Sequence, residues 1–200
     1  CRHPVGVITK NRMIVRDADL LAELASHGAA MASISITTLD VELARKLEPR
    51  ASAPRDRLRA VEELTAAGVP VSVMVAPVVP GLTDHELPAI LEAAAEAGAV
   101  GAGCLPVRLP GAVAPLFEAW LAEHYPDRKE KVLNRIRSLR GGKLNDPRFG
   151  HRMRGHGVFA EQIRALFETA RRRVGLDRRG LELSTTAFRR PGGDQMVLFG

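Results

Sequence analysis

The stretch from Val69 to Asp84, VPVSVMVAPVVPGLTD, constrains the fold of this 200-residue chain more than any other segment. Its first half is almost continuously apolar and rich in valine, and prolines and a glycine end it. Such a run predicts a strand over residues 71–75 that is covered on both faces, as in a parallel sheet. Ligands bind at the carboxyl ends of parallel strands, so we expect the loop over residues 76–82 at the functional face.

The same strand-then-helix pattern occurs four times in the first 125 residues. Further strands are expected over residues 4–9, 32–37 and 99–107, and helices over 17–27, 40–47, 83–98 and 115–124. A longer helix is expected after Pro54, with Leu58, Val61 and Leu64 on one face. Thr83 and Glu86 have the spacing of a capping box at the start of their helix. Four consecutive units with short connections predict an α/β fold with a parallel sheet and right-handed crossovers. The pattern leaves open whether the sheet is doubly wound or curled into a partial barrel.

Beyond residue 126 only helical periodicity remains. Two apolar stripes recur at helical spacing: Val132, Leu133, Ile136 and Leu139, and then Ile163, Leu166, Phe167, Ala170 and Val174. We therefore expect a body over residues 1–125, a basic helical extension over 126–188 and a flexible tail over 189–200.

The extension also carries an uneven share of the charge. Residues 128–190 hold 18 Lys and Arg against 6 Asp and Glu, a balance of +12, which leaves 11 against 17, or −6, for the rest of the chain. Such a split is typical of a protein that binds a polyanion, here nucleic acid. The alternative is that the arginines only keep exposed helix faces in contact with water. The residues expected to contact nucleic acid are Arg137, Arg140, Lys143, Arg148, Arg152 and Arg154.

Composition indicates the compartment. The sequence has no run of about 18 uncharged apolar residues and no leader pattern at its start. Its two cysteines, Cys1 and Cys104, are too few for a disulfide framework. We therefore expect a soluble cytoplasmic protein that does not enter a membrane. Because residue 1 is not methionine, we also expect the chain to be a fragment of a longer protein.

Polar residues end the predicted strands. Thr9, Lys10 and Asn11 follow the first strand, and Ser35 and Thr37 lie at the end of the second. A lysine and several hydroxyl groups on one rim can hold a carboxylate, ribose or phosphate. Ordinary strand-end capping by Thr and Asn explains each single residue equally well.

A series of short strings resembles a known family in order and spacing over about residues 5–110. The strings are VITK at 7–10, SITT at 35–38, LEPR at 47–50, RL at 57–58, AG at 67–68 and VMVAPVVPG at 73–81. They are similar to radical S-adenosylmethionine (SAM) proteins of the spore photoproduct lyase and "DNA repair photolyase" group. The arginine-rich segment RIRSLRGGKLNDPRFGHRMRG resembles the bacterial branch of that group without assigned substrates.

The resemblance implies a partial (β/α)6 barrel that binds SAM against a [4Fe–4S] cluster and cleaves it to a 5′-deoxyadenosyl radical. Lys10 and Ser35 match cofactor-binding positions of the lyase, and Ala76 matches a main-chain contact. Thr9 and Thr37 are assigned to the same site from their adjacency. The lyase resembles this chain up to Glu48 and Pro49 but not at Arg50, whose role is left open.

The CxxxCxxC motif that ligates the cluster in this family is absent from the sequence. Cys1 and Cys104 do not have its spacing, and Cys104 is interpreted as a small buried hydrophobe. In the family the motif lies upstream of the position of Cys1, so this chain alone is expected to be inactive and to hold no cluster. His151 and His156 have no cysteine or carboxylate at metal-ligand spacing, and no metal site is predicted.

Two classes of function follow. The first is part of a radical SAM enzyme that acts on DNA or another nucleic acid. The second is a non-catalytic module that binds nucleic acid or the DNA sliding clamp. Near the end of the chain, QMVLF is similar to clamp-docking peptides, and the expected contacts are Gln195, Leu198 and Phe199. A last strand tucked onto the protein's own core is the alternative for this peptide.

Overall fold

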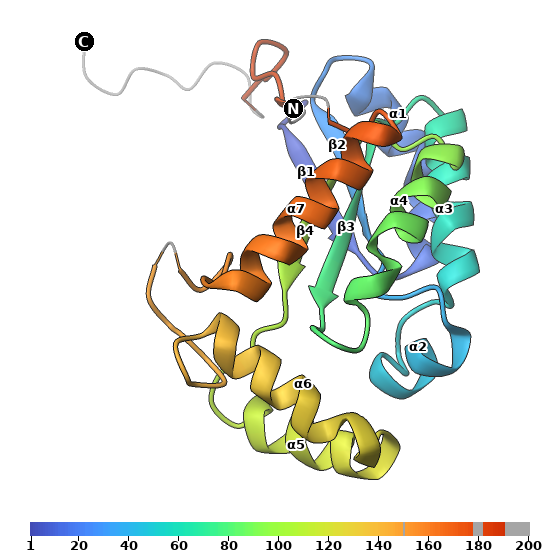
Figure 1. Cartoon of the computed structure of the whole chain (residues 1–200). Helices are drawn as coiled ribbons and strands as arrows, with labels where there is room; N and C mark the ends of the chain where they lie inside the picture. The colour runs from blue at the N-terminus through green and yellow to red at the C-terminus, as the bar shows by residue number, and fades with distance from the viewer. Residues whose placement is uncertain (150, 178–181, 191–200) are drawn as a thin grey trace, which may run out of the picture.

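A computed structural model of the chain describes residues 1–149, 151–177 and 182–190. It has a four-stranded parallel sheet in which the strands follow one another in chain order (Figure 1). The strands are β1 (Val5–Thr9), β2 (Ala30–Ser35), β3 (Val71–Val78) and β4 (Gly101–Pro106). The sequence-based expectation of a parallel α/β fold is confirmed, and the sheet is consistent with part of a radical SAM barrel.

Helices fill the connections between the strands and continue after the sheet. They are η1 (Arg12–Asp17), α1 (Ala18–Ala25), α2 (Val41–Leu47), α3 (Pro54–Ala66), η2 (Asp84–Glu86), α4 (Leu87–Glu96), α5 (Val113–His124), α6 (Pro126–Leu139) and α7 (Val158–Arg173). Figure 1 shows α5 and α6 beyond the arrowhead ends of β3 and β4, while α7 runs back along the sheet next to α4. In the part of the chain that the structure describes, no helix is long and apolar enough to cross a membrane.

One face of the sheet, here called the outer face, is covered by helices. Ile34, Val73 and Ala102 pair in register across β2, β3 and β4, and Val7 of β1 pairs with Ala32. These side chains pack into one core with residues of α1, α3, α4 and α7. The opposite side chains form the inner face, which carries small or polar residues such as Ser33, Ser72 and Gly101. Ile8 of this face is 70% exposed, so the inner face is the open side of the sheet.

A second core lies beyond the carboxyl ends of the strands. It joins apolar residues of α2, α5 and α6 to the loops that follow β3 and β4. The stripe Val132, Leu133, Ile136 and Leu139 is buried as predicted. In α7, Ile163, Phe167 and Ala170 are buried in the first core, whereas Leu166 is 39% exposed and does not join the stripe. Residues after position 126 therefore contribute to both cores.

Three details of the expected elements are wrong. The second strand begins at Ala30 and ends at Ser35, two residues before its expected bounds at both ends. The 3-10 helix η1 was not expected. The capping box is absent, because the Glu86 carboxylate accepts hydrogen bonds from Thr38 Oγ1 at 2.6 Å and the Leu39 amide at 2.7 Å. A tertiary contact with the loop after β2 thus replaces the local one.

Two glycines that end helices give a paired prediction. Gly68 after α3 and Gly98 after α4 both have positive φ, which costs a residue with a Cβ about 1–2 kcal/mol. A Cβ on Gly98 would also lie 3.0 Å from Thr65 Cγ2, whereas Gly68 has open space. Gly98→Ala should therefore lower the free energy of unfolding by about 1 kcal/mol more than Gly68→Ala, measured by urea denaturation. Equal losses of stability in the two variants would show that the Thr65 side chain moves away from the new Cβ without cost.

Candidate functional site

The carboxyl ends of β1, β2 and β3 bring three of the predicted site residues together. The Lys10 ammonium donates hydrogen bonds to Thr37 Oγ1 at 3.0 Å and to the Ala76 carbonyl oxygen at 2.6 Å. The Thr37 hydroxyl lies 3.0 Å from the same carbonyl oxygen. These residues come from separate strands, so the parallel order of the sheet creates the cluster.

Glu48, at the end of α2, completes this cluster. Its Oε1 accepts from Lys10 Nζ at 2.6 Å and lies 2.7 Å from Thr37 Oγ1, and its Oε2 accepts from Arg57 Nη2 at 2.7 Å. A carboxylate between two cations is the electrostatic centre of the rim. The sequence alone assigned Glu48 no role beyond the family resemblance, because nothing local to α2 indicates contact with Lys10 after β1 and Arg57 of α3.

Arg57 of α3 is the second cation that pairs with Glu48. Its side chain is buried, and the residue is 1% exposed. Besides Glu48, the guanidinium donates to the Ser52 carbonyl oxygen at 2.7 Å and to the Ser35 carbonyl oxygen at 3.1 Å. Arg57 therefore ties α3 to the end of β2 and fixes the carboxylate that faces Lys10. A buried charge needs such full pairing to be tolerated.

The two charges of the rim have shifted pKa values. Burial of Glu48 acts to raise its pKa, but hydrogen bonds from Lys10 and Thr37 and the charges of Lys10 and Arg57 outweigh it, so the pKa lies below its ordinary value. Burial lowers the pKa of Lys10, and Glu48 opposes that shift. We infer an ionised carboxylate that two cations hold in place at neutral pH.

The remaining predicted residues of the site are placed differently. Ser35 belongs to the inner face at the end of β2 and is 6% exposed. Thr9 alternates with Ile8 and Lys10 and pairs in register with Ile34 of the outer face. Its hydroxyl accepts a hydrogen bond from the Asn11 amide at 3.0 Å, which is ordinary capping. The structure thus places Ser35, Lys10, Thr37 and Ala76 at one rim and leaves Thr9 outside it.

The inner face next to this rim has an unsatisfied polar atom. Ser33 is 5% exposed, and its Oγ is buried with no hydrogen-bond partner among the described residues. Ser72 and Gly101 continue its row across β3 and β4, and a Cβ on Gly101 would meet open space. A buried hydroxyl without a partner calls for an explanation, and a bound ligand is one. Small residues with hydroxyl groups leave room for a ligand such as SAM, so this face fits the cofactor.

A hollow of about 400 Å³ opens at the rim beside Lys10. It is lined by Lys10, Asn11, Glu48, Pro49, Arg50 and Ala51. Arg50 is exposed and makes no hydrogen bond or ion pair with the described residues. Because Lys10 already holds Glu48, Arg50 is a second cation at this hollow that is open to an anionic group.

The two cysteines do not fit the ligands of an iron–sulfur cluster. Cys104 packs against the outer-face core, and burial raises its pKa to about 11, which opposes the thiolate that iron requires. Cys1 is exposed and precedes β1, with β2 and β3 between it and Cys104. The interpretation of Cys104 as a small buried hydrophobe is correct only in part, because the residue packs against the core but is half-buried.

The arginine-rich segment has both structural and exposed members. Arg140 is 2% exposed, and its guanidinium donates to the carbonyl oxygens of His151, Arg152 and Val107. Its expected contact with nucleic acid is corrected, since the side chain holds the loop to the end of β4.

The other predicted contacts are more accessible. Arg148 pairs with Asp146 at 2.8 Å, Arg137 donates to Asn134 and Arg152 stacks on Phe149. Lys143 and Arg154 are exposed. The predicted clamp contacts Gln195, Leu198 and Phe199 lie outside the described residues.

His151 and His156 do have a carboxylate neighbour, contrary to the sequence-based statement. Asp146 and both histidines can each direct one ligand atom to within 4.8 Å of the others. However, both Asp146 oxygens accept hydrogen bonds from Arg148, whose charge holds the pKa of Asp146 well below its ordinary value. Because the Asp146 carboxylate already has Arg148 as its partner, we assign no metal to this loop.

Comparison with known proteins finds similarity to one superfamily over the first part of the chain. Residues 2–94 match the family model of the radical SAM superfamily. Uncharacterized proteins of Mycobacterium bovis and Mycobacterium tuberculosis are each 34% identical over 154 residues, 76% of this chain. An uncharacterized protein of Acidianus two-tailed virus is 35% identical over 72 residues, 36% of this chain and 23% of its own length. The chain spans 44% of the length of the mycobacterial relatives.

Proposed function

We propose that this chain forms the SAM-binding wall of a radical enzyme. The observation that carries the proposal is the rim cluster of Lys10, Thr37, Glu48 and Ala76, which lies within the segment that matches the radical SAM superfamily. A fixed lysine next to a main-chain carbonyl suits an amino acid group, because the lysine pairs the carboxylate and the carbonyl accepts from the ammonium. The methionyl part of SAM is such a group.

The residues of the rim have separable tasks in this proposal. Lys10 and Arg50 supply positive charge for the carboxylate, and Glu48 with Arg57 holds the Lys10 ammonium in place. The hydroxyl groups of Ser33 and Ser35 on the inner face provide donors for the ribose or the carboxylate. SAM and a [4Fe–4S] cluster, which the superfamily generally uses, supply the radical when both are bound. The cysteines of this chain do not serve as the cluster ligands.

We place the protein near spore photoproduct lyase and the "DNA repair photolyase" group because of the strings around the rim residues. Nucleic acid is proposed as substrate because of the +12 balance of residues 128–190, from 18 basic against 6 acidic residues. The alternative is a non-catalytic module that binds nucleic acid through the same basic residues or the sliding clamp through the QMVLF string.

Anaerobic reconstitution of the full-length gene product tests the proposed chemistry. Iron and sulfide are added, the cluster is reduced with dithionite, and SAM is supplied. We expect 5′-deoxyadenosine, detected by mass spectrometry, and its amount should exceed that of a sample without reductant. A reconstituted cluster that yields no 5′-deoxyadenosine would favour the binding module.

A further inference from the structure

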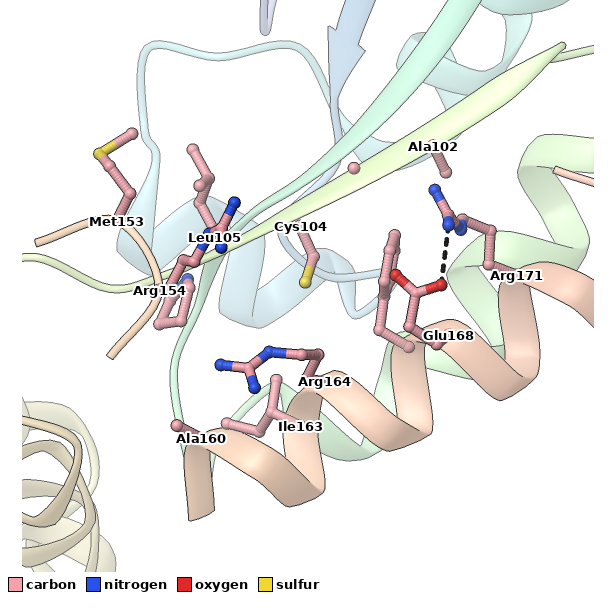
Figure 2. Close-up of a pocket in the computed structure, with 13 residues that line it drawn as sticks. Ala102, Cys104, Leu105, Met153, Arg154, Ala160, Ile163, Arg164, Glu168 and Arg171 are labelled. Carbon is pink, nitrogen blue, oxygen red and sulfur yellow. Dashed lines mark hydrogen bonds and ion pairs between the residues drawn. The ribbon is translucent and has the colours of Figure 1, made fainter. Parts of the chain in front are cut away.

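A pocket of about 390 Å³ lies between β4 and α7, away from the rim cluster (Figure 2). Among the described residues, β4 is an edge strand, so no further strand closes this side. One wall is formed by residues 102–106 of β4, and another by residues of α7 from Ala160 to Arg171. Met153 and Arg154 of the preceding loop close the end beside Leu105 and Pro106. The pocket therefore reaches the carboxyl end of β4.

Positive charge dominates the polar lining. The lining contains three arginines, Arg154, Arg164 and Arg171, and one carboxylate, that of Glu168. Arg171 forms an ion pair with Glu168 at 2.7 Å, which the dashed line in Figure 2 marks. Its guanidinium also stacks on Phe167. Arg154 and Arg164 are exposed, and their side chains make no hydrogen bond or ion pair with the described residues. Two guanidinium groups are thus open to an anion.

The rest of the lining is apolar. Cys104 of β4 points toward α7, which contributes Ile163 and Phe167, and Met153 lies at the loop end next to Leu105. Figure 2 shows the Arg164 guanidinium projecting from α7 below Cys104, so charge and apolar surface meet in one pocket. A simple inorganic anion would use only the arginines. A ligand with an anionic group on a flat, partly apolar body uses both, and this volume is in the range of small-molecule sites.

We propose that this pocket binds a nucleotide, with its phosphate on Arg154 and Arg164 and its base or sugar against Met153 and Phe167. Planar guanidinium groups recognise phosphate through paired hydrogen bonds. The nucleotide can be free or part of a strand, and the chemistry is the same. Binding of a nucleic-acid strand in this pocket rests on the proposed function. Binding of a nucleotide here requires neither the rim cluster nor an iron–sulfur cluster.

Fluorescence anisotropy with a labelled oligothymidylate of roughly 12 nucleotides tests the site on the full chain. The variant is Arg154→Ala/Arg164→Ala. The matched control is Arg55→Ala/Arg59→Ala, which removes the same charge from two exposed arginines of α3. We expect the pocket variant to weaken binding by at least about tenfold and to lower the salt slope by about 1.4, while the control changes affinity less than about twofold.

Equal losses in both variants would overturn the site, since they would show attraction by diffuse charge only. Absence of binding by the wild-type chain at low salt would overturn it as well. Competition by thymidine 5′-monophosphate assigns the pocket to a free nucleotide, and competition by the unlabelled oligonucleotide alone assigns it to a strand.

Cys104 gives a local check that does not depend on the arginine variants. In a Cys1→Ser background, the bound oligonucleotide should slow maleimide labelling of Cys104, which lines the pocket. An unchanged labelling rate at saturating oligonucleotide would place the ligand elsewhere. Neither readout involves SAM, so failure here and failure of the proposed radical chemistry are distinguishable.

Discussion

Glu48→Gln should lower the free energy of unfolding by about 3–5 kcal/mol, the usual loss when one partner of a buried ion pair is removed. The substitution keeps the size of the side chain but removes the charge that faces Lys10 and Arg57. Arg57 is 1% exposed, so its charge would lie in the interior without a counter-charge. Urea denaturation of the wild-type chain and the variant measures the difference.

Glu63→Gln is the matched control. Glu63 pairs with Arg12 at 2.6 Å, but both side chains are at least 35% exposed, so its loss should stay within about 1 kcal/mol. If the two variants lose the same stability, the Glu48 network contributes no more than a surface pair.

The pH dependence of the Glu48 effect has a definite sign. The pKa of Glu48 is lowered in the folded chain, so its stabilising contribution is present above the ordinary pKa of 4.5 and is lost as the pH falls through the lower folded value. The stability difference between wild type and Glu48→Gln should therefore shrink below about pH 4. A difference that grows as the pH falls would contradict an ionised Glu48.

Lys10→Ala should weaken SAM binding by about tenfold to a hundredfold, because charge-assisted hydrogen bonds contribute about 1.5–3 kcal/mol. The experiment uses the full-length gene product with a reconstituted cluster and isothermal titration calorimetry under anaerobic conditions. Iron content should not change, since Lys10 is not proposed as a cluster ligand.

Lys46→Ala controls for the loss of a positive charge near the rim. Lys46 lies on α2, two residues before Glu48, and its ammonium stacks on Tyr125 at 5.4 Å instead of facing the rim. SAM affinity should remain within about twofold in this variant. An affinity that falls equally in both variants would indicate a general charge effect and not a contact of Lys10.

The sequence was sufficient to predict four parallel strands, but their order in the sheet came from the structure. Apolar runs and short connections are local signals, and so is Asp40 at the start of the expected helix over residues 40–47. It caps α2, with Oδ1 accepting from the Glu42 and Leu43 amides. The capping box failed where a distant loop competed for the Glu86 carboxylate. Local patterns therefore predicted elements well but not the bonds that tertiary contacts redirect.

The candidate site was predictable only in part for the same reason. Strand ends share a rim in any parallel sheet, so Lys10 and Thr37 could be placed together before the structure was known. Glu48 could not, because its partners are Lys10, 38 positions away, and Arg57, nine positions away on another helix. Likewise, the arginine count predicted a basic region, but only the fold separates buried Arg140 from exposed Arg154.

A structure of the full-length protein with bound SAM tests the central claim most directly. We expect Lys10 Nζ within about 3.2 Å of the methionyl carboxylate while Glu48 still pairs with Arg57. We also expect the methionyl ammonium at the Ala76 carbonyl oxygen, which Lys10 contacts at 2.6 Å in this structure. A carboxylate bound elsewhere, with Lys10 still engaged only by Thr37, Glu48 and Ala76, would contradict the account.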